Sequence, residues 1–362
     1  GSSLSAWMSN TATTALLLPL GQRTTTGHVN PDDESASSQA SPRFAFALML
    51  MCAYACSAGG IATIVGTPPN GIGFTHLRTI DTDFSFLHWM LIGTPITIVL
   101  LFLIYATLIM LHRPGPQTRA NSLWMTRKPD QRPWSAGEIN VVLAFGTTVL
   151  LWIIPGLSTL FFGIDTPMTL WLKHRLPIAG PATLGAILLF ILPIRSKQHQ
   201  TTLSWREAAR IDWGTLLLFG GGLCLGGPMH ETGLAASFGN VLTRLPGASS
   251  LWGLTLWCIF TATFLTELTS NTAAISMLAP LVIATAGMAN VSPIPPLLGA
   301  TLGCSCAFML PVATPPNAIV YSSGIIPIGQ MVKTGALLNL VTGLAVWLLL
   351  RLLCPALGMT VG

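Results

Sequence analysis

The stretch Met8–Thr13, with the sequence MSNTAT, recurs later in the chain as Thr269–Ala274, with the sequence TSNTAA. A second motif, GTPPNG at Gly66–Gly71, follows the first copy, and ATPPNA at Ala313–Ala318 follows the second copy. The two motifs therefore occur in the same order in both halves of the chain. A paired motif that occurs twice in order predicts an internal structural repeat.

The sequence around these motifs has the composition of a membrane protein. Charged residues make up 8% and hydrophobic residues 51% of the 362 residues, whereas about a quarter of the residues in a soluble domain are charged. Several apolar stretches are long enough to cross a bilayer as a helix. We therefore expect an all-α, multi-pass integral membrane protein, in contact with lipid, in the plasma (inner) membrane. The seventeen basic residues are scattered along the chain, so we expect no nucleic-acid partner.

The basic residues also predict the orientation of the chain, because cytoplasmic loops of membrane proteins carry an excess of Lys and Arg. Most of them lie in four polar segments, which are Gly21–Arg43, Arg113–Gly137, Arg195–Arg210 and Tyr321–Thr334. With these segments in the cytoplasm, the first Ser-Asn-Thr motif is entered from the cytoplasm and the second from outside. The two halves are then inverted repeats, which is a common plan of secondary transporters.

The predicted repeats divide the chain into three parts. Residues 1–112 form an incomplete N-terminal repeat with a hairpin tip, a broken helix and one crossing. Residues 113–137 form a cytoplasmic linker, and residues 138–362 form the C-terminal inverted repeat. The chain starts only a few residues before Ser9, so we expect the first hairpin to lack most of its first arm.

Both motifs contain residues that interrupt helices inside a membrane. A Pro-Pro pair leaves backbone groups unpaired, which is tolerated at membrane depth only where the backbone lines a polar cavity. Ser, Asn and Thr satisfy free backbone groups at turns and helix starts. We therefore predict an inverted-repeat transporter with two re-entrant helical hairpins, each with a Ser-Asn-Thr tip, and two Pro-broken helices that face a binding site.

The predicted site is neutral, which indicates what it binds. Helix N-termini attract anions, and backbone carbonyls offer oxygen ligands to cations such as Na⁺. Neither motif contains Lys, Arg or His, so a bound dianion has no fixed cationic side chain beside it. Sodium ions bound next to the anion neutralise its charge, which favours symport over exchange. We expect no catalytic residues in such a site.

Glu267 is the exception to this neutrality, because it lies just before Ser270. An ionisable residue at membrane depth is a functional candidate by default. The alternative, which we favour, is an acid that is protonated or hydrogen-bonded and braces the hairpin, because a fixed negative charge repels an anion. An intramembrane enzyme requires an acid–base or metal constellation, which only Glu267, Glu231 and His230 approach, so we do not expect an enzyme.

Four stretches resemble the divalent anion/sodium symporter family, whose members carry dicarboxylates, citrate or sulfate; they are Leu4–Pro19, Gly59–Gly71, Phe264–Pro280 and Leu310–Val320. The resemblance implies two or more Na⁺ ions, a substrate between the tips, and a homodimer with an elevator motion. The sodium ligands that it implies are Ser5, Ser9, Asn10, Gly66, Thr266, Thr269, Asn271 and Ala313. The substrate-binding residues that it implies are Ser9, Asn10, Thr11, Thr67, Ser270, Asn271, Thr272, Thr314 and Pro315. Family members have several helices before the first hairpin, so an N-terminally truncated sequence is expected.

Together these observations predict a secondary active transporter that takes up a small dianion with Na⁺. A C4-dicarboxylate such as succinate or malate is the favoured substrate. Sulfate or citrate symport and dicarboxylate exchange are alternatives, because the side chains at the tips do not reveal the length of the pocket. A non-transporting membrane fragment is a further alternative, suggested by the early start of the chain.

Overall fold

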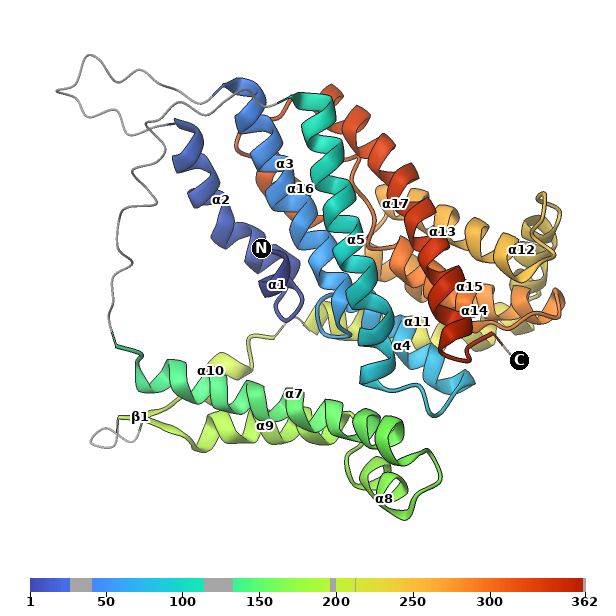
Figure 1. Cartoon of the computed structure of the whole chain (residues 1–362), viewed down its shortest axis with the longest axis horizontal. Coiled ribbons are helices and arrows are strands. Elements are labelled where there is room, and N and C mark those ends of the chain that lie inside the picture. Colours follow the sequence, from blue (N-terminus) through green and yellow to red (C-terminus); the bar gives the residue numbers. More distant parts are fainter. Residues whose placement is uncertain (27–40, 114–132, 196–199, 212, 361–362) are drawn as a thin grey trace. The chain divides into compact units, whose positions relative to one another are not determined.

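The computed structural model describes the whole chain except residues 27–40, 114–132, 196–199, 212 and 361–362 (Figure 1). Its described residues fall into two compact units. The first unit comprises Gly1–Asp83, Met90–Trp124 and Gly214–Gly362, and the second comprises Phe84–Trp89 and Met125–Trp213. The two units are described separately below.

The regular secondary structure in the described residues of the first unit is helical. Its helices before the second unit are α1 (Ser2–Ser5), α2 (Asn10–Thr26), α3 (Pro42–Gly59), the 3₁₀ turn η1 (Gly60–Ala62), α4 (Pro68–Ile80) and α5 (Phe86–His112), the last of which begins in the second unit. Its later helices are α11 (Trp213–Glu231), α12 (Leu234–Thr243), α13 (Leu251–Leu268), α14 (Asn271–Met288), α15 (Ile294–Gly303), α16 (Pro315–Tyr321) and α17 (Ile328–Ala356).

Each motif of the sequence marks the start of a helix. α2 and α14 begin at the Asn of the two Ser-Asn-Thr motifs, and α4 and α16 begin at the first Pro of the two Pro-Pro pairs. Proline suits the first position of a helix because its missing N–H would be unpaired there in any case. Four helices therefore start within the motifs, two in each half.

The helices of the two halves pack against one another in a crossed arrangement. Within each half, α2 lies along α3, and α13 lies along α14 and α15. Between the halves, α16 packs against α2 and α3, while α4 packs against α14 and α15. Figure 1 shows α2, α3 and α16 next to one another, and α4 near α14 and α15. The motif helices thus pack in pairs across the two halves, α16 with α2 and α4 with α14.

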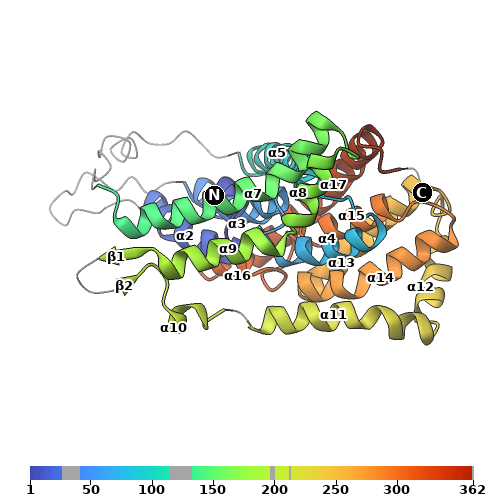
Figure 2. The same ribbon diagram turned by 90° about the horizontal axis from the view of Figure 1, so that it is seen from below.

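The second unit is built on α7 (Ala136–Phe162), which lies side by side with α9 (Ala179–Ile191) in Figures 1 and 2. α7 begins with a capping box, in which Ser135 Oγ accepts a hydrogen bond from Glu138 N and the Glu138 carboxylate accepts one from Ser135 N. The remaining elements of this unit are α8 (Pro167–Arg175), β1 (Pro193–Arg195), β2 (Gln200–Thr201) and α10 (Trp205–Ala208).

Among the residues that the structure describes, six helices are long and apolar enough to cross a bilayer: α3 with η1, α5, α7, α13, α14 and α17. A seventh crossing is counted if α8 and α9, which meet at an angle of 53°, form one bent span. These helices confirm the prediction of a multi-pass integral membrane protein. Helix α3 with η1 is 78% buried over its apolar window, whereas α7 is 22% buried, so α3 forms the centre of its unit.

Three details add to what the sequence suggested. The described residues are not purely helical, because β1 and β2 form a short antiparallel pair. α2 continues to Thr26, so the first residues of the polar segment Gly21–Arg43 are helical, and residues 27–40 lie outside the described residues. Most of the expected linker 113–137 also lies outside them, and α7 already begins at Ala136.

Candidate functional site

The two Ser-Asn-Thr motifs form helix N-termini of the same construction. The Ser9 carbonyl accepts a hydrogen bond from Thr13 N at 3.0 Å, and the Ser270 carbonyl accepts one from Ala274 N at 2.8 Å. The N–H groups of a first helical turn have no partner within the helix and carry a partial positive charge. Neither first turn contains an acidic residue. Both N-termini can therefore receive an anion.

Three of the four hydroxyl-bearing residues in the two Ser-Asn-Thr tips are exposed. Ser9, Thr11 and Ser270 are exposed, while Asn10 and Asn271 are half-buried. Ser270 is the N-cap residue of α14, yet its side chain makes no capping hydrogen bond. Ser and Asn at such positions usually satisfy a backbone N–H with their side chain. At Ser270 the hydroxyl is free of that role and can bind a ligand.

The first half-site is the group formed by Ser5, Asn10 and the chain between Cys56 and Thr67. Ser5 Oγ lies 2.5 Å from Asn10 Oδ1 and 2.7 Å from the Cys56 carbonyl oxygen. A hydroxyl has one hydrogen to donate, so three oxygens share a single proton at this point. Such a group of oxygens is the kind of ligand set that a hard cation prefers.

The second half-site is the group formed by Thr266, Asn271 and the chain between Cys304 and Thr314. It repeats the arrangement of the first: Thr266 Oγ1 lies 2.5 Å from Asn271 Oδ1 and 3.3 Å from the Cys304 carbonyl oxygen. A hydroxyl, an amide oxygen and a backbone carbonyl oxygen again converge. The structure thus brings together Ser5 with Asn10 and Thr266 with Asn271.

The two glycines of the first half-site allow a close approach of the chain. A Cβ atom at Gly60 would overlap the carboxamide of Asn10, and a Cβ atom at Gly66 would overlap the Gly60 backbone. Gly66 thus packs against the Gly60 backbone, and Gly60 in turn packs against the Asn10 side chain. In the second half the residue at the corresponding place is Ala313, which is buried and donates its backbone N–H to the Leu310 carbonyl at 3.2 Å.

The side chains of Asn70 and Asn317 act as clamps, because they join the starts of α4 and α16 by hydrogen bonds to the chain segments that precede these helices. Asn70 Nδ2 donates to the Gly60 and Thr63 carbonyl oxygens, both at 2.8 Å. Asn317 Nδ2 donates to Ala307 O at 3.2 Å and to Leu310 O at 3.0 Å.

The Oδ1 atoms of both Asn70 and Asn317 are buried without a hydrogen-bond partner. These clamps were missed as site residues by reasoning from sequence, although each Asn occupies the same place in its motif.

The residues that start α4 and α16 differ in one respect. Thr314 Oγ1 accepts a hydrogen bond from Asn317 N at 3.3 Å and so caps α16. Thr67 precedes α4 but makes no side-chain capping hydrogen bond. Thr67 is largely buried, with 7% of its surface exposed, and its hydroxyl does not cap its own helix. Pro315 is exposed at the first position of α16.

Two of the predicted residues are less well placed for binding through their side chains. The Thr269 hydroxyl donates to the Leu265 carbonyl of its own helix at 3.2 Å. Thr272 is 8% exposed, and its carbonyl oxygen accepts a hydrogen bond from Ser276 Oγ at 2.8 Å. The Thr269 hydroxyl and the Thr272 carbonyl oxygen are thus already engaged within the helices, whereas the first-turn N–H group of Thr272 can bind a ligand.

Glu267 is a brace of the second half-site. Its Oε1 accepts hydrogen bonds from Met309 N at 2.9 Å and Asn339 Nδ2 at 2.7 Å, and its Oε2 accepts one from Leu310 N at 3.0 Å. The side chain is 3% exposed. Its carboxyl oxygens are therefore occupied by donors from the loop after α15 and from α17, as expected of an acid that braces the hairpin.

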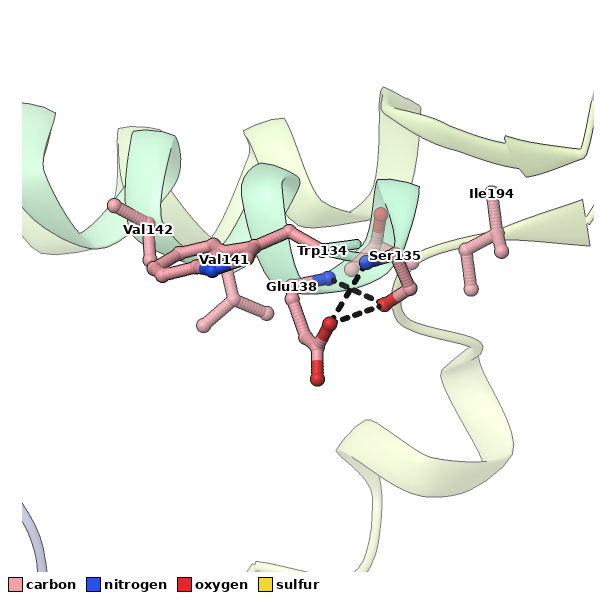
Figure 3. Close-up of a pocket in the computed structure, with 8 residues that line it drawn as sticks. Trp134, Ser135, Glu138, Val141, Val142 and Ile194 are labelled. Carbon is pink, nitrogen blue, oxygen red and sulfur yellow. Dashed lines mark hydrogen bonds between the residues drawn. The ribbon is translucent and has the colours of Figure 1, made fainter. Parts of the chain in front are cut away.

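A hollow of about 660 Å³ lies in the second unit, at the start of α7 (Figure 3). The Glu138 carboxylate lines this hollow, and Figure 3 shows that it points toward Ser135 within the capping box. The carboxylate is thus already used by the helix start, and the rest of the wall is largely apolar. The lining residues are Trp134, Ser135, Gly137, Glu138, Val141, Val142, Ile194 and Thr202. This hollow lacks the converging oxygens of the two half-sites.

Comparison with known proteins agrees with this geometry. A family model for citrate transporters (CitMHS) matches residues 2–303 and 168–360. The sodium-dependent dicarboxylate transporter SdcS of Staphylococcus saprophyticus is 32% identical over 367 aligned residues, which cover 97% of this chain and 67% of that protein. The protein of the same name from Staphylococcus aureus strain MRSA252 is 32% identical over 363 residues, with the same coverage. These relatives are transporters and not enzymes, and they confirm the resemblance to sodium-coupled anion transporters. The chain belongs to the citrate transporter family.

Proposed function

We propose that this chain is a secondary active transporter that moves a dicarboxylate across the membrane together with Na⁺. The favoured substrate is a C4-dicarboxylate such as succinate or malate. The observation that carries the proposal is the duplicated oxygen group, Ser5 with Asn10 and Thr266 with Asn271, beside two neutral helix N-termini. The relatives named sodium-dependent dicarboxylate transporters support the same conclusion.

In this proposal each half-site binds one Na⁺ ion. Ser5, Ser9, Asn10 and Gly66 are the ligands of the first ion, and Thr266, Thr269, Asn271 and Ala313 are those of the second. The convergence of three oxygens on one hydroxyl proton supports these sites, because a bound cation removes the repulsion among the remaining lone pairs. Na⁺ binds to neutral oxygen ligands, and the proposed ligands of both half-sites are neutral. The nearby Glu267 carboxyl is already engaged in hydrogen bonds.

The dianion then lies between the two tips. Its carboxylates meet the tip residues and the residues that start α4 and α16, which are Ser9, Asn10, Thr11, Thr67, Ser270, Asn271, Thr272, Thr314 and Pro315. First-turn N–H groups of α2 and α14 supply hydrogen bonds and the positive ends of helix dipoles. The uncapped Ser270 and Thr67 hydroxyls are available for the same purpose.

The proposed architecture is a pair of inverted repeats in the plasma membrane. Residues 1–112 and 138–362 form the two repeats, each with a re-entrant hairpin and a Pro-broken helix, and residues 113–137 link them in the cytoplasm. The shared construction of the two half-sites supports this assignment. We further propose a homodimer with an elevator motion, as in the family that the motifs resemble.

Citrate is the second candidate substrate, because the matching family model describes citrate transporters. Citrate and succinate both present carboxylates to the tips, but citrate is bulkier and carries a third carboxyl group. Sulfate has the charge of succinate with a much shorter separation between its oxygens. Competition among these anions therefore reports the length of the site.

Uptake into proteoliposomes tests the proposal directly. The purified chain is reconstituted, and the initial rate of radiolabelled succinate uptake is measured with an inward Na⁺ gradient and with K⁺ at the same concentration. We expect uptake only with Na⁺ and competition by unlabelled malate. Equal uptake under both conditions would indicate exchange, and no uptake of succinate, malate, citrate or sulfate would contradict the proposal.

A pair of asparagine variants controls for general damage. Asn271→Ala removes the amide oxygen of the second half-site and is expected to reduce Na⁺-dependent uptake by at least tenfold. Asn240→Ala makes the same change at an exposed position of α12 and is expected to leave uptake unchanged. Equal activity of the two variants would remove Asn271 from the proposed site.

A further inference from the structure

A buried tyrosine connects the two halves of the first unit beside the half-sites. Tyr54 Oη donates a hydrogen bond to the Phe308 carbonyl oxygen at 2.8 Å, and the two rings meet edge to face with centroids 4.9 Å apart. Both residues are 0% exposed. Tyr54 lies on α3, two residues before Cys56, whose carbonyl contacts Ser5 in the first half-site.

Phe308 in turn belongs to the loop of the second half-site. Its backbone N–H donates to Asn339 Oδ1 at 3.1 Å, and Asn339 Nδ2 donates to Glu267 Oε1 at 2.7 Å. Glu267 directly follows Thr266 in α13 and holds the backbone N–H groups of the next two loop residues. Tyr54 thus begins a continuous set of buried hydrogen bonds that ends at the second half-site.

The two halves differ in this set of hydrogen bonds. Glu267 lies four residues before Asn271, and the residue four before Asn10 is Ala6. At that place the Ala6 backbone carbonyl accepts a hydrogen bond from Thr63 Oγ1. The first half-site is therefore hydrogen-bonded here to residues of its own half. The second half-site is hydrogen-bonded, through Phe308, to Tyr54 on α3 of the other half.

We propose that Tyr54 is a positioning residue that links the two half-sites, so that Na⁺ bound at one raises the Na⁺ affinity of the other. The inference rests on the proposed function, because it requires a Na⁺ ion at each half-site. Na⁺ at Ser5 and Asn10 fixes the end of α3, the Tyr54 hydroxyl then fixes Phe308, and the ordered loop presents its oxygens to the second ion. The linkage acts equally in the reverse direction.

Removal of one hydroxyl group tests the linkage. Tyr54→Phe keeps the ring that packs on Phe308 and deletes only the donor. Na⁺ titrations of succinate uptake are compared between the parent and the variant, at constant ionic strength. We expect a Hill coefficient above 1 for the parent and about 1 for the variant, with the half-saturating Na⁺ concentration raised by about 3- to 10-fold, within the usual range of couplings between sites.

Tyr105→Phe is the matched control, because Tyr105 is an exposed tyrosine of α5. It is expected to retain the parent's Hill coefficient. A purely structural role of Tyr54 is recognised by the thermal midpoint in detergent. In that case Tyr54→Phe lowers the midpoint equally at every Na⁺ concentration and leaves the Hill coefficient unchanged, which overturns the inference.

A second variant keeps the test decisive if Tyr54→Phe does not fold. Asn339→Ala cuts the same set of hydrogen bonds beyond Phe308, and it too must lower the Hill coefficient. A parent with Na⁺-dependent uptake and a Hill coefficient of 1 overturns the linkage but leaves the proposed function intact. A parent whose uptake and thermal midpoint are both independent of Na⁺ overturns the sodium sites themselves.

Discussion

The sequence narrows the role of Glu267 to two possibilities, and the structure decides between them. Its position just before a Ser-Asn-Thr motif marks it in the sequence as either a functional or a bracing acid. Its partners decide between the two, and they lie 42, 43 and 72 residues further along the chain. Two of them are backbone N–H groups, which leave no trace in the identity of a residue. The sequence therefore favoured a bracing role, but the partners of the carboxyl became visible only in three dimensions.

The brace predicts a loss of stability in Glu267→Gln. The glutamine side chain has the same shape, but its NH₂ group would face N–H donors that now point at a carboxyl oxygen. A buried donor left without an acceptor costs about 1–3 kcal/mol. We expect the free energy of unfolding to fall by about that amount, measured by thermal or denaturant unfolding in detergent without Na⁺.

Glu231→Gln provides the matched control for this change. Glu231 is exposed at the end of α11, and surface substitutions of this kind usually alter stability by less than about 0.5 kcal/mol. If Glu267→Gln unfolds at the same midpoint as Glu231→Gln, the carboxyl does not brace the loop, and its role must be sought in ion binding instead.

At the scale of helices, the sequence predicted where the chain is interrupted but not how the interruptions are held. The Pro-Pro pairs place the starts of α4 and α16 because proline fixes its own φ and lacks an N–H. The carboxamides of Asn70 and Asn317, however, reach back to carbonyls 7 and 10 residues earlier. Those contacts depend on the exact fold of the break, which no local pattern specifies.

Asn70→Asp tests the clamp of the first break. The substitution preserves the size of the side chain but replaces both donated hydrogen bonds by an oxygen that faces the Gly60 and Thr63 carbonyls. We expect the free energy of unfolding to fall by about 1–3 kcal/mol, read from unfolding in detergent. Asn290→Asp, at an exposed turn with φ of 51°, is the control and is expected to change stability little. Equal stability of both variants would argue against a clamp.

Gly60→Ala tests the fit between the first break and its hairpin tip. The added methyl group would displace the Asn10 carboxamide from Ser5. We expect the Na⁺ concentration for half-maximal succinate uptake to rise at least tenfold, because the first half-site loses a positioned oxygen ligand. Gly221→Ala is the control, since a Cβ there meets nothing within 4 Å. A Gly60→Ala protein with the parent's Na⁺ dependence would place the first ion elsewhere.

At the scale of the whole molecule, composition and repeated motifs predicted a multi-pass membrane transporter, and both are confirmed by the spans and the family. The crossed packing of α16 on α2 and of α4 on α14 was not foreseen. Sequence similarity relates each segment to its copy, but packing depends on which apolar faces fit. The repeat boundaries and the opposite directions of entry stay predictions, because no bilayer direction follows from the fold alone.

Opposite entry of the two hairpins can be measured at two equivalent serines. Ser41 and Ser250 cap α3 and α13 and are both exposed, so Ser41→Cys and Ser250→Cys lose similar capping hydrogen bonds. The exposed Cys224 and half-buried Cys52 are first replaced by Ala, which leaves buried native thiols. The positive-inside rule places Ser41 in the cytoplasm and Ser250 outside. A membrane-impermeant maleimide should therefore label only Ser250→Cys in right-side-out vesicles and only Ser41→Cys in inverted ones. Labelling of both from one side would show that the repeats are not inverted.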